Sequence, residues 1–353
     1  MSGNPASAAP KSDLTFDWKL LAAQVAFAAA VAAGVGVVAM KSLVLPDFGM
    51  FWAAHHVAQP YSSAVLPKML GAKHVLYFPY PPTFLFLTLP LAWVSLSAGY
   101  LGWIALSASS LVASLRRLAA PVVLAVPAVF MAGIVGQTSL FMGALLFAGA
   151  TLPKRPVLAG VLFGVAACIK PQVLVLVPLV LLAAGQWRTL ASAAASGLIL
   201  CLAASLVYGP GAWLDWLTSL PAFLQINDAR FTGRYLALPG LWKIGALLVG
   251  AAACWLAGRS GQIERGVFIA IAAALLGSLH AMDYDAAILA PFAVSAALSL
   301  RWPAFAYAAA LIVLPSVWTV LAMGALATLD LSWGSGLRIS LGQPASKQNG
   351  NVL

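Results

Sequence analysis

Charged residues are scarce in this chain, at 8% of its 353 residues, whereas 62% of the residues are hydrophobic. A soluble domain carries roughly 25% charged residues, because they cover its surface. The scarcity excludes an ordinary soluble protein and predicts an all-α polytopic membrane protein. The 19 basic residues outnumber the 9 acidic ones, but they mostly stand singly or in pairs in short breaks. This distribution is typical of membrane proteins and does not indicate nucleic-acid binding.

Cysteine is also rare, and the three cysteines all lie inside apolar runs, at Cys168, Cys201 and Cys254. They form no CxxC motif and have no spacing typical of a metal site. They are therefore predicted to be small packing residues of helices. From the residues alone we expect neither a metal ion nor a cofactor.

Long apolar runs divide the chain. Residues 1–17 form a polar arm that is predicted to be disordered and cytoplasmic. Trp18–Met40 is too long for the core of a signal peptide and is predicted to be an uncleaved anchor. We expect a transmembrane domain over residues 18–324 with about 11 (roughly 10–13) spans, followed by a tail over residues 325–353. The later apolar runs are Ala98–Leu115, Ala119–Val135, Ser139–Leu152, Val157–Ile169, Pro171–Ala184, Thr189–Tyr208, Leu241–Gly258, Gly266–His280, Asp285–Leu300 and Pro303–Met323.

Basic residues indicate which breaks face the cytoplasm. The alternation works only if Pro81–Leu96 does not cross the membrane. This segment begins with two prolines and contains Pro90, so it is predicted to be a re-entrant or juxtamembrane helix at the outer face. The expected cytoplasmic breaks hold Arg116-Arg117, Lys154-Arg155, Arg188, Arg259/Arg265 and Arg301. The expected non-cytoplasmic breaks are Leu45–Pro82, Gly136–Thr138, Lys170-Pro171, the large loop Gly209–Gly240, and His280–Asp285.

The first of these outer breaks, Leu45–Pro82, concentrates polar and aromatic side chains. It holds three of the four histidines, two lysines and seven aromatic residues. Asp47 is the only carboxylate between Asp17 and Asp215. No second acid with metal-ligand spacing accompanies it. A carboxylate at a membrane surface can act as a general base, or it can cap a short helix.

Several short motifs, taken in order, resemble glycosyltransferase family 87. They are Asp47-Phe48, Tyr61, Phe78–Pro82, Pro90-Leu91, Gly136-Gln137, Ala159-Gly160, Ile169–Pro171 and His280–Asp285. The resemblance implies a membrane enzyme of the GT-C fold that transfers mannose from a polyprenyl phosphate on the non-cytoplasmic face. It also implies a catalytic aspartate in the first outer loop, which matches Asp47. The last motif reads HAMDYD, so the family's acid can match either Asp283 or Asp285.

The chemistry of such a transfer requires the residue types that these breaks contain. A general base takes the proton of the attacking acceptor hydroxyl, and Asp47 is the candidate. Basic groups stabilise the leaving phosphate. The candidates for phosphate binding are Lys170, His280, Arg230 and Arg234, and those for substrate binding are Gln137, Tyr80, Asp283 and Asp285. A lipid monophosphate donor does not demand a divalent ion in the way that a nucleotide diphosphate does.

These candidates also have structural interpretations. Lys170 can extend its amine to the membrane interface from a helix end. Gln137 can close a tight helical hairpin, and Tyr80 can pack at the interface. The two arginines can be solvated loop charges.

The sequence thus predicts an integral-membrane hexosyltransferase, with mannose as the expected sugar, in a bacterial inner or plasma membrane. Its expected partners are a polyprenyl-phosphate sugar donor, a lipid or glycan acceptor and membrane lipids, without nucleic acid. One alternative is a lipid or glycan transporter or flippase. A transporter would place charges near the membrane midplane, whereas these apolar runs carry theirs near the ends. A second alternative is a non-enzymatic factor of cell-envelope assembly.

Overall fold

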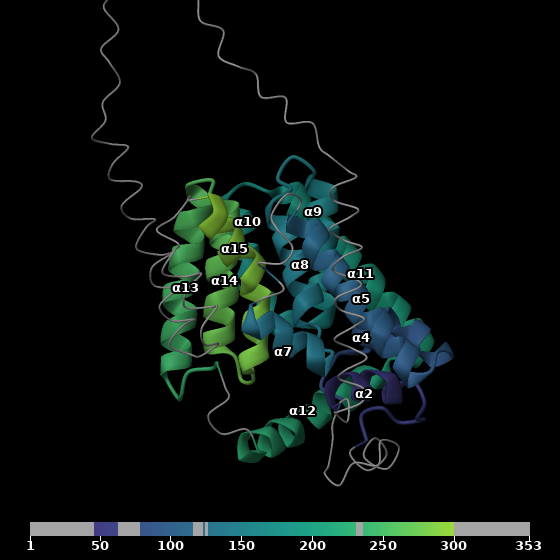
Figure 1. Ribbon diagram of the computed structural model, residues 1–353. Coiled ribbons are helices and arrows are strands. Elements are labelled where there is room, and N and C mark those ends of the chain that lie inside the picture. Colours follow the sequence, from purple (N-terminus) through teal and green to yellow (C-terminus); the bar gives the residue numbers. More distant parts are fainter. Residues whose placement is uncertain (1–45, 63–77, 116–122, 124–125, 231–235, 300–353) are drawn as a thin grey trace, which may run out of the picture.

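The computed structural model describes residues 46–62, 78–115, 123, 126–230 and 236–299, and every regular element in these ranges is helical (Figure 1). The α-helices are α2 (Pro46–Ala54), α4 (Pro82–Leu87), α5 (Leu96–Leu115), α7 (Pro127–Val135), α8 (Ser139–Ala150), α9 (Pro156–Ile169), α10 (Val177–Ala183), α11 (Trp187–Tyr208), α12 (Gly211–Arg230), α13 (Trp242–Arg259), α14 (Ile263–Gly277) and α15 (Ala290–Ser299). Three 3₁₀ helices join them: η1 (Leu89–Trp93), η2 (Pro171–Leu174) and η3 (Asp283–Leu289).

The apolar runs and the observed helices coincide to within a few residues across the middle of the chain. Two of the segments between these runs contain helices of their own. The large loop expected at Gly209–Gly240 is mostly a helix, α12, which continues through Pro221. The segment Pro81–Leu96, expected to form a re-entrant or juxtamembrane helix, contains the short helices α4 and η1. The predicted anchor Trp18–Met40, Arg116-Arg117, the run Pro303–Met323 and the two terminal segments lie outside the described residues.

Among the described residues, two helices are long and apolar enough to cross a membrane, namely α5 and α11. Shorter apolar helices occupy Ser139–Ala150, Pro156–Ile169 and Pro171–Ala183. The all-helical architecture is consistent with a helical membrane protein, but the predicted count of about 11 spans is not confirmed. The outward face of α11 is apolar, with Leu198, Ile199 and Leu206 more than half exposed. Such a surface suits lipid rather than water.

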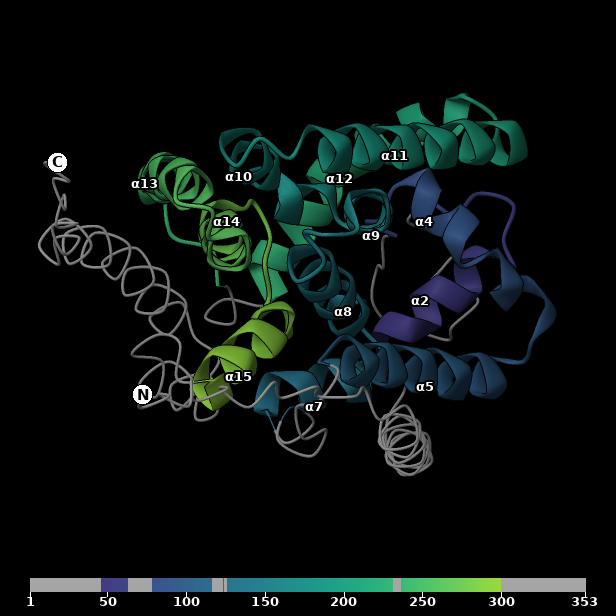
Figure 2. The ribbon, with the colours of Figure 1, turned by 90° about the horizontal axis from the view of Figure 1, so that it is seen from above.

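The helices form layers that Figure 2 shows from above. α8 lies between α5 and α9, and α11 packs on the other side of α9. Glycines bring α9 and α11 close together. A Cβ at Gly160 would meet the carbonyl oxygen of Thr189, and a Cβ at Gly164 would lie 2.6 Å from the carbonyl oxygen of Ala193. This small-residue spacing, four residues apart, is a frequent device for close packing of membrane helices.

The two ends of the bundle carry different connections and different exposed side chains. The connections α8–α9, α10–α11 and α13–α14 lie at one end, and α2 and α12 lie at the other (Figure 1). The first end carries exposed Lys154, Arg155, Arg188 and Arg259. At the opposite end, the backbone N–H of Leu238 donates to Leu276 and ties the chain before α13 to the end of α14. The polar breaks between the remaining helices also converge there.

Candidate active site

Lys170 and Asp285 form an ion pair between two breaks in the apolar helices. Lys170 follows α9, and its Nζ lies 2.6 Å from Oδ1 of Asp285 in η3. The side chains are only 11% and 5% exposed. Burial opposes both charges, but the carboxylate raises the pKa of Lys170 and the ammonium lowers the pKa of Asp285. The pair therefore stays charged inside the protein.

The remaining bonding capacity of Asp285 is directed to the protein itself. Ser139, the first residue of α8, donates its hydroxyl to Oδ1 at 2.7 Å. The backbone N–H of Met282 donates to Oδ2 at 3.1 Å and completes a capping interaction at the start of η3. Asp285 thus holds three elements together and orients Lys170. Its expected role in substrate binding stays a prediction, and its contacts among the described residues are with these internal partners.

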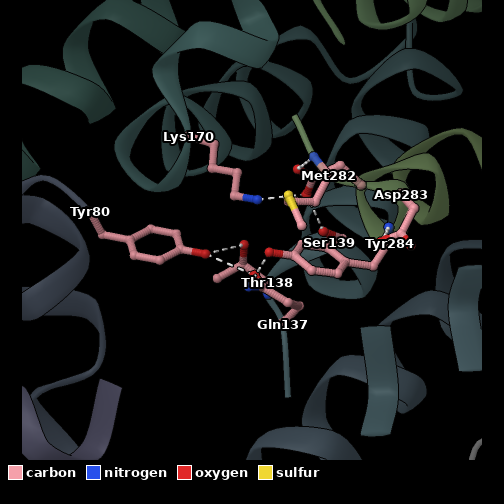
Figure 3. Close-up of polar contacts among 9 residues, drawn as sticks. Tyr80, Gln137, Thr138, Ser139, Lys170, Met282, Asp283 and Tyr284 are labelled. Carbon is pink, nitrogen blue, oxygen red and sulfur yellow. Dashed lines mark hydrogen bonds and ion pairs between the residues drawn. The ribbon is translucent and has the colours of Figure 1, made fainter. Parts of the chain in front are cut away.

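Two tyrosines flank the ammonium group of Lys170. Its Nζ lies 5.8 Å from the ring centroid of Tyr80 and 6.0 Å from that of Tyr284. Gln137 links the two phenols, because the Tyr80 hydroxyl donates to its Oε1 at 2.8 Å and its Nε2 donates to the Tyr284 hydroxyl at 3.1 Å. In Figure 3 the two phenols point toward each other, and Lys170 extends into the same space. Thr138 lies beside this network, with its hydroxyl 3.4 Å from that of Tyr80.

The turn between α7 and α8 sets the position of Gln137. Gly136 ends α7 with a left-handed φ of 68°, a conformation that glycine adopts without strain. A Cβ at this position would lie 2.6 Å from Cβ of Phe48 in α2. The turn therefore approaches α2 closely and packs beside Phe48, the neighbour of Asp47. Gln137 therefore lies in a tight helical hairpin and borders the charged site.

Asp47 lies in the first turn of α2 and is half-buried. Its negative charge affects the pKa values of residues in the ion-paired cluster. Burial raises the pKa of Tyr80 and of Tyr284, and the negative charge of Asp47 adds to both shifts. Burial lowers the pKa of Lys170, but Asp285, Tyr80 and Asp47 together raise it more, and Asp47 has the smallest effect of the three. The aromatic ring of Phe51 anchors α2 against Tyr80, with centroids 5.1 Å apart. A carboxylate and an ammonium from segments far apart in sequence thus share one electrostatic environment.

The remaining candidate residues are Asp283, His280, Arg230 and Arg234. Asp283 is half-buried, and its Oδ1 accepts the backbone N–H of Tyr284 at 2.8 Å. His280 packs against Phe223 of α12, with ring centroids 4.9 Å apart. Arg230 ends α12, but its side chain is not among those described, and Arg234 lies outside the described residues. Of the two acids in HAMDYD, the structure places Asp285 beside Lys170.

Sequence reasoning missed Ser139 and Tyr284 as site residues. Tyr284 stands in the HAMDYD motif and could have been found there, because it lies between the two acids. Ser139 follows Gly-Gln-Thr and carried no signal of its own. Among the described residues, no three His, Cys, Asp or Glu side chains are grouped so that they could hold a metal ion.

Apolar helices around a buried, charged site are consistent with the class of helical membrane proteins. This chain belongs to glycosyltransferase family 87, whose family model matches residues 78–282, more than half of the sequence. The resemblance found in the motifs is thereby confirmed, and the chain is a glycosyltransferase with a sugar donor and an acceptor. Asp47, Asp283 and Asp285 lie outside the matched range. No curated protein and no solved structure matches the chain.

Proposed function

We propose that this enzyme transfers a hexose, mannose in particular, from a polyprenyl phosphate to a lipid or glycan acceptor. The observation that carries the proposal is the buried Lys170, which is oriented by Asp285 and influenced by the charge of Asp47. A cation and a separate carboxylate are the two groups that transfer from a phosphate leaving group requires.

Lys170 is suited to the donor phosphate. An ammonium group has three N–H donors, and the structure shows one of them donated, to Asp285. The remaining donors are available to phosphate oxygens without breaking the ion pair. Tyr80 and Tyr284 flank the ammonium and present two hydroxyls to the same space. Charge-assisted bonds from Lys170 would stabilise the negative charge that develops on the leaving phosphate.

Asp47 is the proposed general base. The acceptor hydroxyl oxygen attacks the anomeric carbon as the bond from that carbon to the phosphate oxygen breaks. The hydroxyl proton passes to the Asp47 carboxylate, and polyprenyl phosphate leaves with the bonding electron pair. A single displacement of this kind inverts the anomeric configuration. The donor is a monophosphate, so the chain's own cation can meet its charge.

The position of the site relative to the basic residues supports a non-cytoplasmic active site. Lys154, Arg155 and Arg188 are exposed at the end of the bundle opposite α2 and α12. Cytoplasmic segments of membrane proteins carry the excess of lysine and arginine. We therefore assign the site to the periplasmic or extracellular face of an inner or plasma membrane.

A donor comparison tests the proposal. The purified protein in phospholipid nanodiscs, supplied with a total lipid extract as acceptor, is given radiolabelled polyprenyl-phosphate mannose or radiolabelled nucleotide mannose. We expect label from the polyprenyl donor to enter products that resist mild acid, which cleaves the donor itself. We also expect no dependence on added divalent ions. Transfer from the nucleotide sugar alone would overturn the assigned donor class.

A further inference from the structure

A cavity of about 540 Å³ lies between the segment after α2 and the helix α12. One wall is the segment 58–62, which follows α2, and the other is α12. Tyr208, the last residue of α11, and Leu85 of α4 also line it. Its volume is within the range of small-molecule binding sites.

Hydroxyl and amide groups dominate the polar lining of this cavity. Gln59, Tyr61 and Ser62 contribute from one wall, and Thr218 and Ser219 contribute from α12. Both α12 hydroxyls donate to carbonyl oxygens of their own helix, so their oxygen atoms remain available as acceptors. These hydroxyl and amide groups are neutral, and each can form hydrogen bonds with a hydroxylated ligand.

Two further lining residues, Tyr208 and Asp215, differ in what they offer to a ligand. The Tyr208 hydroxyl is buried and has no hydrogen-bond partner among the described residues. Its side chain therefore contributes aromatic surface to the cavity wall, and its hydroxyl is shielded from the cavity. Asp215 carries the only charge among the lining residues that the structure describes, and that charge is negative. It favours hydroxyl donors and disfavours phosphate.

The cavity shares a wall with the proposed catalytic site. The Tyr61 hydroxyl donates to the carbonyl oxygen of Tyr80 at 3.2 Å, while the Tyr80 phenol belongs to the network beside Lys170. Trp216 of α12 donates its indole N–H to the carbonyl oxygen of Pro79 at 3.0 Å. Burial, then Tyr208 and Asp215, raise the pKa of Tyr61, which therefore stays a hydrogen-bond donor.

We propose that this cavity binds the hydroxylated, uncharged headgroup of the acceptor, a sugar or other polyol. The assignment as acceptor site rests on the proposed function, whereas the binding of a neutral sugar does not. The two substrates are thereby separated by charge. The donor phosphate is held at Lys170, and the neutral headgroup is held beside Asp215.

A protection experiment tests the binding without requiring catalysis. Thr218→Cys places a thiol in the cavity wall, and its labelling by an impermeant maleimide is measured in nanodiscs above the background of the parent protein. The probes are methyl hexosides, short neutral oligosaccharides and hexose 6-phosphates. We expect the neutral sugars to slow labelling at least several-fold at millimolar concentration, and the hexose phosphates to protect less well.

Two controls make the result specific. Leu217→Cys, at an exposed residue of α12 outside the cavity lining, should be labelled at the same rate with and without sugar. Asp215→Asn, combined with Thr218→Cys, should reduce the preference for neutral sugars over hexose phosphates. Absence of protection by every neutral probe would overturn the proposal, as would stronger protection by the phosphates.

Transfer kinetics separate this inference from the proposed function. Ala222→Phe fills the cavity, and Leu217→Phe is the matched control on the exposed face. We expect Ala222→Phe to raise the acceptor KM by at least tenfold and to leave donor binding unchanged. An unchanged acceptor KM would overturn the acceptor assignment. If protection occurs without any transfer from polyprenyl-phosphate mannose, the sugar site stands and the proposed donor fails.

Discussion

At the scale of single residues, the ion pair of Lys170 and Asp285 has two separable consequences. It fixes the geometry of the ammonium group that we propose as the phosphate-binding group, and it makes each partner necessary to the other's burial. Removing one member of a buried pair leaves an uncompensated charge, which typically costs about 3–5 kcal/mol. Replacing both members with apolar residues avoids that cost. Stability and activity can therefore be distinguished by mutation.

We expect Lys170→Met and Asp285→Leu each to lower the free energy of unfolding by about 3–5 kcal/mol. The double variant should regain most of that stability but remain inactive. Donor affinity of Lys170→Met should fall by about ten- to a hundredfold, for loss of one charge-assisted bond. Denaturant unfolding and donor-binding titrations measure both effects, with exposed Lys154→Met as control. A Lys170→Met protein with parental donor affinity would exclude this lysine from the phosphate site.

His55 predicts a pH effect on stability that is independent of catalysis. Its Nε2 lies 3.0 Å from the Thr88 hydroxyl, and burial, then His56, lower its pKa to about 4. Its ordinary pKa is 6.5. Between these values the unfolded chain binds a proton that the folded protein does not, so stability falls as the pH decreases through this window.

The expected outcome is a lower Tm at pH 5 than at pH 7.5, with a smaller decrease in His55→Gln. The exposed His56→Gln variant should retain most of the parental decrease. Thermal unfolding of the three proteins at both pH values provides the measurement. An equal decrease in all three would show that His55 does not cause it.

At the scale of elements, apolar runs predicted the helices better than the breaks between them. Runs such as Val157–Ile169 have no competing turn signals, and α9 follows them closely. α12 was predicted as part of a loop because Asp215, Asn227 and Asp228 stand in a break between two apolar runs. Its tryptophans nevertheless pack against the rest of the protein, as the Trp216 contact with Pro79 shows. Tertiary contacts of this kind are not visible in local sequence.

The contact of α9 with α11 predicts which glycines are essential to the bundle. We expect Gly160→Leu and Gly164→Leu each to lower stability by about 1–3 kcal/mol or more, because the added side chain meets the backbone of α11. Gly102→Leu in α5, where an added Cβ meets nothing within 4 Å, is the control. Denaturant unfolding checks the result. Parental stability in both α9 variants would contradict the close approach of the two helices.

At the scale of the whole molecule, charge alternation predicted that the polar breaks gather at one end. The structure brings Tyr80, Gln137 and Lys170 together there, as Figure 3 shows. The pairing of Lys170 with Asp285 could not be predicted, because the residues are 115 positions apart and either acid of HAMDYD was a candidate. Which partner a buried charge selects depends on packing in three dimensions.

The same arrangement predicts the membrane orientation. In a background without native cysteines, we expect Gln59→Cys to react with an impermeant maleimide added to intact cells. Arg155→Cys should react only after the membrane is opened. Gln59 and Arg155 are both exposed, so access to the reagent depends on the side of the membrane. Labelling of Arg155→Cys in intact cells would reverse the assignment of the active-site face.

The most direct test of the account is the turnover of Asp47→Asn, because the proposed reaction requires a base at this position. Asparagine keeps the shape of aspartate and serves equally well near a helix start, but it cannot take the acceptor's proton. The account predicts that transfer from polyprenyl-phosphate mannose falls by about 10²–10⁴, whereas donor binding and unfolding stay at parental values. If Asp47 only stabilises α2, Asp47→Asn will be active and Asp47→Ala will be impaired. An active Asp47→Asn enzyme would contradict the central claim.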